Sequence, residues 1–160
     1  MLRCADFDAN ALAWAPQIRQ GGVVYGAYAA AVTSSIHHRD IAAVAARTLA
    51  GTGPQGHSYV LTGPQSLTQP DKVRLTGEAT GLELSFVEVA PEQLRRAMLA
   101  QGLPEEIPDR LLGSLADYAR QPGPTTDTVE QLLGRPALTS RTRQPRALPP
   151  SAQVRDPADC

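Results

Sequence analysis

A glycine-rich hexapeptide is the stretch whose residue types and spacing first suggest chemistry. Residues 51–56, Gly-Thr-Gly-Pro-Gln-Gly, match the G-x-G-x-x-G pattern of dinucleotide-binding loops. In that motif the loop follows a strand and opens a helix, so that backbone amides at the helix N-terminus bind the pyrophosphate. Here a helical pattern precedes the hexapeptide and a strand pattern follows it. We therefore predict a helix-to-strand loop and no dinucleotide site at these residues.

The three histidines are the next candidates, as metal ligands. A zinc site needs three or four ligands that converge from supported positions. His37 and His38 are adjacent and are expected to point in different directions, and His57 has no Cys or carboxylate pair at ligand spacing. We predict no metal site, and place these residues at a helix start and a strand edge. Arg39 and Asp40, which follow, are expected to form a capping and salt-bridge pair.

Two further candidates for reactive groups are a tyrosine paired with a lysine and a free thiol. A lysine four residues after a tyrosine could lower the pKa of a catalytic tyrosine, but Thr68 stands four residues before Lys72, the single lysine. Cys4 is a candidate thiol, but no neighbour in the sequence would lower its pKa, so we expect it to be inert. Cys4 and Cys160 lie at opposite ends of the chain, which argues against a disulfide framework and for a reducing cytoplasm.

The chain is organised around a helix and the strand after it. Ala and Leu favour a helix over residues 41–49, and Asp40 suits its first turn. Gly51 is a natural stop, and residues 59–63 form a short apolar run typical of a strand buried on both faces. The predicted inward face of the helix consists of Ile41, Val44, Ala45, Thr48 and Leu49.

The remaining elements complete an α/β pattern. Thr68 and Asp71 form a capping-box arrangement for a helix that ends at Gly81. In the longest helix, which runs over residues 104–120, the residues expected to face inward include Ile107, Leu111 and Leu112. Other helices are predicted at residues 7–14 (bounded by Pro16), from Pro91 to Gly102, and at 127–134, with strands at 23–25, 31–36 and 84–89.

Composition excludes several partners. The 160 residues have a net charge of −1, which gives no electrostatic case for nucleic acid or an anionic membrane. There is no apolar run of the roughly 20 residues that a bilayer requires, and no secretory signal, so a cytoplasmic protein is expected. We predict a folded part over residues 1–137 and a disordered tail, rich in Pro and Arg, over residues 138–160.

Four segments in this order resemble the NmrA-like, NAD(P)-binding branch of the atypical short-chain dehydrogenase/reductases, which includes azoreductase-like and quinone-reductase-like proteins. Leu-Arg-Cys-Ala-Asp-Phe-Asp-Ala-Asn at residues 2–10 resembles the family's Leu-Arg-Pro…Phe-Met-x-Asn. Cys4 and Asp8 depart from it, at the Pro and Met positions. The others are the His-x-Arg-Asp-Ile-Ala helix in residues 36–45, the strand and cap in 59–68, and the closing helix in 126–136.

The resemblance implies an incomplete Rossmann-like parallel sheet with a mostly helical substrate-side subdomain. It implies NADP or NAD as cofactor and a small-molecule acceptor as substrate. In this family the Gly-rich loop that holds the cofactor would lie upstream of Met1. Phe7 and Asn10 are the candidates for the substrate cleft, where an aromatic could cover a ring and an amide could bind a polar group. The alternative is that Phe7 lies in the core and Asn10 on a helix surface.

Three functions follow as hypotheses. The first is the substrate-side part of an NAD(P)H-dependent oxidoreductase, inactive alone for want of the nucleotide-binding half. The second is a non-catalytic NAD(P)-sensing or binding module. The third is a truncated gene product without autonomous function, because a parallel strand such as residues 59–62 expects neighbours on both sides.

Overall fold

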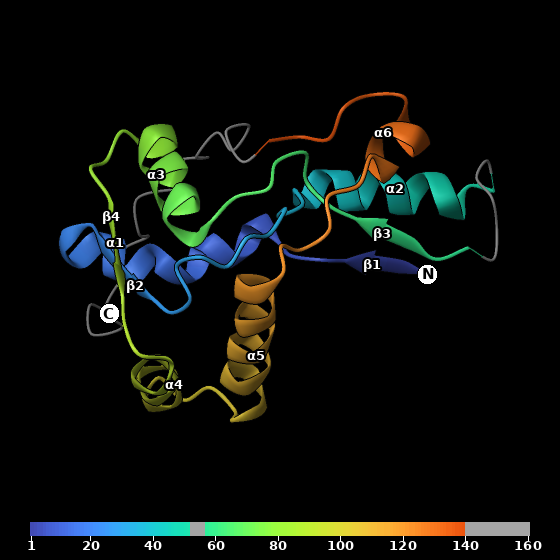
Figure 1. The fold of residues 1–160 in the computed structure, drawn as a ribbon. Coiled ribbons are helices and arrows are strands. Elements are labelled where there is room, and N and C mark those ends of the chain that lie inside the picture. Colours follow the sequence, from blue (N-terminus) through green and yellow to red (C-terminus); the bar gives the residue numbers. More distant parts are fainter. Residues whose placement is uncertain (52–56, 140–160) are drawn as a thin grey trace, which may run out of the picture.

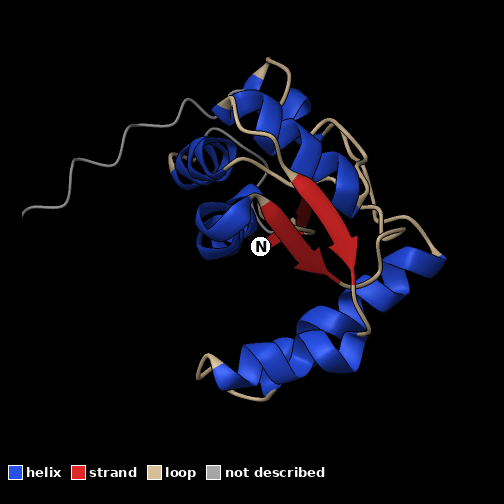
Figure 2. Cartoon of the chain, turned by 90° about the vertical axis from the view of Figure 1, so that its left-hand side faces the viewer, coloured by secondary structure: helices blue, strands red, loops and turns tan. Residues whose placement is uncertain are grey.

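Two small parallel sheets organise the chain. The computed structural model describes residues 1–51 and 57–139. In one sheet β1 (Leu2–Cys4) pairs with β3 (Tyr59–Leu61), and in the other β2 (Val23–Gly26) pairs with β4 (Ser85–Glu88). Figure 1 shows the sheets at opposite ends of the molecule, and Figure 2 shows β2 and β4 as arrows that run in the same direction. The predicted α/β fold class is confirmed.

Helices cover one face of the first sheet. α2 (His38–Leu49) and α6 (Thr128–Leu133) lie against it, as Figure 1 shows. Their shared core with the strands consists of Ile36, Val44, Leu61 and Val129, all at most 1% exposed. Val60 is 38% exposed, so the expectation of a strand buried on both faces is wrong within the described residues. Since neighbouring strand residues point to opposite faces, only the side of Tyr59 and Leu61 is covered.

The second sheet lies among the remaining helices. α1 (Ala15–Gly21) packs on β2, and α3 (Gln69–Thr80) packs on β4. α4 (Pro91–Ala100) and α5 (Glu106–Arg120) form a helical pair below this sheet in Figure 1. A 3-10 helix, η1 (Asp8–Trp14), leads from the first sheet into α1, where a single α-helix bounded by Pro16 was expected.

Local sequence signals set several element ends. The capping box of Thr68 and Asp71 is present in both directions, and α3 ends at Gly81, whose φ is 70°. The closing helix α6 ends at Gly134, whose φ is 68°. A positive φ is a conformation that glycine adopts at little cost. These predicted ends are confirmed.

Three residues predicted to face inward are exposed, and one predicted strand is absent from the described residues. Leu49 was expected to face inward, but the last turn of α2 extends past the sheet, and its side chain is 86% exposed. Ile107 and Leu111 are exposed as well, because α5 packs through Leu112 and the buried Pro108. Residues 31–36 form no continuous strand. They make isolated bridges instead, one from Thr33 to Leu67 and one from Ile36 to Phe7.

Some predictions fall outside the described residues. These are five of the six residues of the glycine-rich hexapeptide, 52–56, and almost all of the proposed tail. The boundary at residue 137 therefore stays a prediction. Among the helices that the structure describes, none is both long and apolar enough to cross a bilayer.

Candidate functional site

The candidate site lies where β1 and β3 end. Parallel strands present their carboxyl ends at the same edge of a sheet, and open α/β sheets bind ligands outside that edge. Asp6 and Phe7 follow β1 there, and Gly63 follows β3. The backbone of Ile36 holds this end of the chain, since Ile36 N donates to Asp6 O at 2.9 Å and Asp8 N donates to Ile36 O at 3.0 Å.

The Asp6 carboxylate joins three parts of the chain. Its Oδ1 accepts hydrogen bonds from the backbone N of Phe7 at 2.8 Å and from Asn10 Nδ2 at 2.9 Å. Its Oδ2 accepts from the Oγ1 of Thr33 at 2.7 Å and the Oγ of Ser35 at 2.5 Å. The Nζ of Lys72 lies 2.7 Å from the same Oδ2 and also donates to Thr33 Oγ1.

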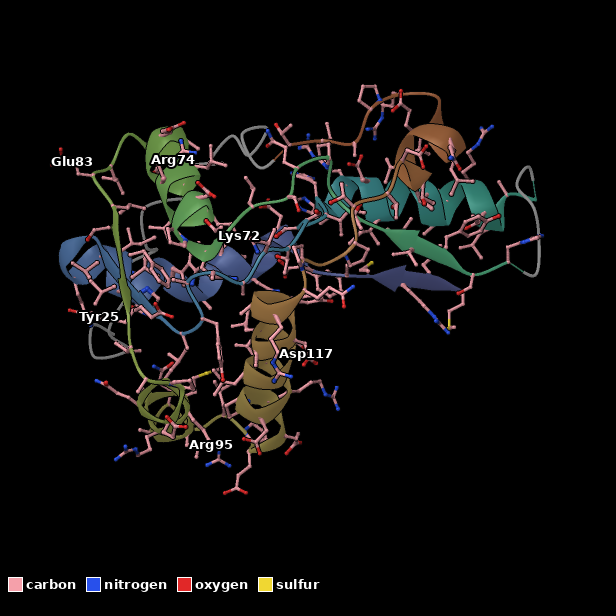
Figure 3. The ribbon with its side chains drawn as sticks, in the orientation of Figure 1. Tyr25, Lys72, Arg74, Glu83, Arg95 and Asp117 are labelled. Carbon is pink, nitrogen blue, oxygen red and sulfur yellow. The ribbon has the colours of Figure 1, made fainter. Side chains whose placement is uncertain are left out.

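This ion pair is largely withdrawn from water. The side chains of Lys72 and Asp6 are 13% and 16% exposed. Burial works to raise the pKa of Asp6, but the Lys72 ammonium and the hydrogen bonds from Lys72, Ser35 and Thr33 outweigh it and hold the pKa below its ordinary value. Asp6 is therefore an ionised carboxylate at neutral pH. Figure 3 labels Lys72 in α3, on the side that faces the chain leaving β1.

Phe7 and Asn10, the two predicted cleft residues, lie on the same short segment. Phe7 is 46% exposed, so the alternative in which it is a core residue is wrong. Asn10 is exposed in η1, and its side-chain amide is fixed by Asp6. Asn10 N also donates to Phe7 O at 2.9 Å, which holds the two residues in one turn. The structure therefore brings them together at the carboxyl edge of the sheet.

The start of α2 has a different arrangement from the predicted one. His37 caps the helix, because its Nδ1 accepts a hydrogen bond from Arg39 N at 3.1 Å. The rings of His37 and His38 are stacked with centroids 4.3 Å apart, so the expectation that they point apart is wrong. Asp40 is fully buried and pairs with Arg135 Nη2 at 2.7 Å rather than with Arg39. Its other oxygen accepts from the backbone N of Leu138 at 2.7 Å.

His37 makes a testable contribution to pH dependence. Burial, and then the neighbouring His38, lower the pKa of His37 below its ordinary value. The unfolded chain then takes up a proton that the folded protein disfavours, so the free energy of unfolding should fall as pH drops below about 6.5. His37→Asn, which can still cap, should flatten this loss. Urea unfolding at pH 7.5 and 5.5 measures it, with His57→Asn, at an exposed position, as the control that should keep the wild-type slope.

Other reactive groups add little at this edge. Burial raises the pKa of the Cys4 thiol, which keeps it protonated, as its predicted inertness requires. Among the described residues no group of three or more His, Cys, Asp or Glu side chains could hold a metal ion.

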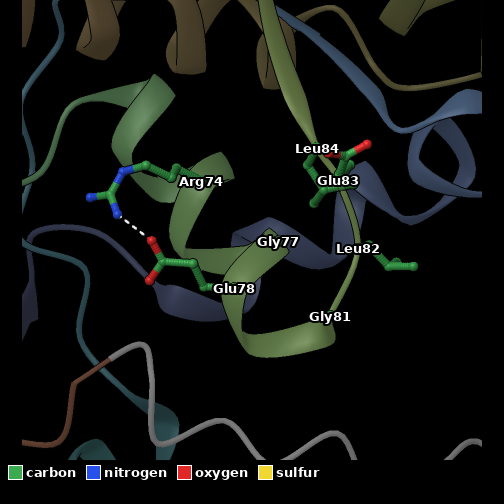
Figure 4. Close-up of a pocket in the computed structure, with 7 residues that line it drawn as sticks. All are labelled: Arg74, Gly77, Glu78, Gly81, Leu82, Glu83 and Leu84. Carbon is green, nitrogen blue, oxygen red and sulfur yellow. Dashed lines mark hydrogen bonds and ion pairs between the residues drawn. The ribbon is translucent and has the colours of Figure 1, made fainter.

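Two shallow hollows lie elsewhere on the molecule. One, of about 400 Å³, is formed by the end of α3 and the loop after it, and Figure 4 shows Arg74 paired with Glu78 at its side. The other, of about 250 Å³, lies between α4, α5 and the loop after β2, beside the ion pair of Arg95 with Asp109. Phe7 and Asn10 line neither of them.

Comparison with known proteins identifies the relatives of this fold. No protein-family model matches the chain. It is 33% identical to a (4-alkanoyl-5-oxo-2,5-dihydrofuran-3-yl)methyl phosphate reductase of Streptomyces griseus over 140 residues. The matched segment covers 88% of this chain and 50% of that protein. It is also 36% identical to an NAD(P)H azoreductase of Xenophilus azovorans over 135 residues, and this segment covers 83% of this chain and 47% of that protein.

A solved structure of a related kind of enzyme has a similar fold. The NADPH-dependent quinone oxidoreductase of Escherichia coli, in its complex with NADPH, matches with a TM-score of 0.74 and 25% identity over 86% of this chain and 49% of that one. The fold is thus that of part of a Rossmann-like, NAD(P)-binding protein. The chain is homologous to the C-terminal part of the NmrA-like, NAD(P)-binding reductases, as its four segments predict. It spans about half the length of the curated relatives that it matches.

Sequence reasoning missed the polar cluster at the site. Asp6 and Lys72 are 66 residues apart in the chain, and Thr33 and Ser35 lie in a segment predicted as a strand. One signal was available, because Lys72 is the only lysine in the chain. A lysine immediately after the capping-box Asp71 must lie in the first turn of α3, on a helix that packs against the body of the protein.

Proposed function

We propose that this chain forms the acceptor side of an NAD(P)H-dependent reductase, and that the acceptor is a quinone-like or azo-type molecule bound against Phe7 and Asn10. The relatives named above include an azoreductase and a quinone oxidoreductase. The observation that supports the proposal is the half-exposed aromatic ring of Phe7 beside a fixed amide at the carboxyl edge of a parallel sheet. A flat conjugated acceptor can stack on the ring and accept a hydrogen bond from the amide.

The cofactor would be bound by residues other than those described. A pyrophosphate needs a turn that joins a strand to a helix N-terminus and brings backbone amides close to the phosphates. Within residues 1–51 and 57–139 no Gly-rich turn of this kind joins a strand to a helix. In the proposed reaction NAD(P)H supplies the hydride. This chain's own residues orient the acceptor and shield it from water, and we expect no turnover from the isolated chain.

A non-catalytic role is the second candidate, and the same observation favours it. If the chain takes part in no reduction, the exposed Phe7–Asn10 turn would serve to bind a small ligand in a ligand-sensing module.

We also propose a cytoplasmic location, in keeping with two cysteines at opposite ends of the chain.

Acceptor binding is tested with menadione, a naphthoquinone. Trp14 is the only tryptophan and ends η1, the helix that contains Asn10, so a bound quinone should quench its fluorescence. We expect saturable quenching by the wild-type chain, with a dissociation constant raised about three- to tenfold in Phe7→Ala by the loss of ring stacking. Asn10→Ala should weaken binding by a similar factor, because the amide contact is lost.

The control is Leu12→Ala, which shortens another exposed side chain of η1 and should leave the affinity unchanged. N-acetyltryptophanamide corrects for light absorbed by menadione. Equal affinity of Phe7→Ala and wild type would place the acceptor elsewhere. Oxidation of NADPH, followed in the same samples with menadione present, tests both candidates, since steady turnover by this chain would contradict each of them.

A further inference from the structure

The Asp6 carboxylate divides its contacts between two parts of the molecule. Its Oδ1 faces the candidate site, where it accepts from the Phe7 backbone and the Asn10 side chain. Its Oδ2 faces the body of the protein, where it accepts from Lys72 and two hydroxyl groups. The carboxylate is therefore the direct link between the exposed turn and the packed helix α3.

Only an ionised carboxylate suits this position. The five groups around Asp6 are all donors: one backbone N–H, one amide, two hydroxyls and one ammonium. A carboxylate is an acceptor on both oxygens, with about four lone-pair directions. An amide in its place would offer one oxygen and would turn its NH2 group against the donors on the other side.

Lys72 supplies the positive charge that balances Asp6 in this setting, while the hydrogen bonds from Thr33 and Ser35 also favour the carboxylate. The capping box of Thr68 and Asp71 fixes the first turn of α3, from which Lys72 extends. A charge pair whose partners are both largely withdrawn from water is screened less than a surface pair, so the attraction between the two charges is stronger. The same ammonium also donates to Thr33, which in turn donates to Asp6.

We propose that Asp6 is a positioning residue for the acceptor. Its ionised carboxylate, paired with the Lys72 ammonium, holds Phe7 and Asn10 in the geometry from which they contact the bound molecule. This inference rests on the proposed function, because it concerns the same acceptor. Asp6 itself lies beneath the turn and acts through its neighbours. Without it the turn would keep its sequence and lose its fixed orientation.

Two variants separate positioning from general stability. Lys72→Met leaves every contact between Asp6 and the turn in place but buries a carboxylate without its cation, so it should lower stability strongly. The double variant Asp6→Asn with Lys72→Met removes both charges and keeps the side-chain volumes, so it should be more stable than Lys72→Met alone. It leaves one amide oxygen for donors on two sides, so the turn loses its fixed position.

The expected result is that affinity and stability change in opposite orders. Menadione affinity, read from Trp14 quenching, should fall less than threefold in Lys72→Met and about tenfold in the double variant. Urea unfolding should rank the double variant above Lys72→Met. Leu112→Ala, a truncation of a buried side chain in α5, serves as the matched control that loses stability and keeps its affinity. Affinity that follows stability across these variants would overturn the proposal.

Acrylamide quenching of Trp14 gives a readout that needs no acceptor. The double variant should expose Trp14 to acrylamide more than either wild type or Leu112→Ala. If the wild-type chain shows no saturable menadione binding, the proposed function fails and the acceptor role of Asp6 fails with it. Saturable wild-type binding together with unchanged affinity in the double variant overturns the positioning role alone.

Discussion

Replacing Arg135 by Met should destabilise the protein by about 3 kcal/mol, and more than replacing Asp40 by Asn. Asp40 is fully buried, whereas the Arg135 side chain is 41% exposed. Loss of the arginine leaves a buried carboxylate that still accepts a hydrogen bond from the backbone N–H of Leu138 but has lost its cation. Loss of the carboxylate charge leaves a guanidinium that can turn to water, so Asp40→Asn should cost only about 1–2 kcal/mol.

Urea unfolding at pH 7 measures both variants. The control is Arg120→Met, since Arg120 and Asp117 form an exposed i, i+3 pair whose partners are 77% and 75% exposed. A pair of this kind should contribute less than 1 kcal/mol. Equal effects of the Arg135 and Asp40 substitutions would contradict the asymmetry, and would mean that water reaches Asp40 once the arginine is gone.

The ion pairs of Asp40 with Arg135 and of Asp6 with Lys72 show which part of the structure could be predicted from the sequence. The cap formed by Thr68 and Asp71 was predictable because its partners are three residues apart and its geometry is local. The partner of Asp40 is 95 residues away, and the partner of Asp6 is 66 residues away. Nothing in local spacing indicates such pairs. For Asp40, adjacency in the sequence points to Arg39 instead of Arg135.

The candidate site shows the same division. Phe7 and Asn10 were selected through resemblance to a family, and the structure places them in one exposed turn. The carboxylate that fixes this turn sits one residue before Phe7 but was missed, because its meaning depends on α3 and on residues 33–35. Periodicity located the helix ending at Leu49 without showing that the sheet stops short of it, since helix pattern carries no information about sheet width.

Gly63→Ala should be the most disruptive single-methyl change near the site. A Cβ at this position would lie 2.1 Å from the carbonyl oxygen of Ser35, and this neighbour is backbone rather than a flexible side chain that could move aside. Gly63 N also donates to Ser34 O at 3.0 Å, so moving the two backbone segments apart to make room breaks that hydrogen bond. We expect a loss of about 3 kcal/mol, at the upper end for an added methyl group.

The effect should reach the acceptor site because Ser35 is shared. Its carbonyl would meet the new methyl group, and its hydroxyl donates to Asp6. Gly63→Ala should therefore weaken menadione binding as well as stability. Gly113→Ala is the matched control: its added Cβ meets nothing within 4 Å, and in the interior of α5 alanine should stabilise the helix by about 0.5–1 kcal/mol. Opposite signs for these two glycine substitutions in urea unfolding would locate the close contact at the end of β3, and a neutral Gly63→Ala would show that this edge can open without cost.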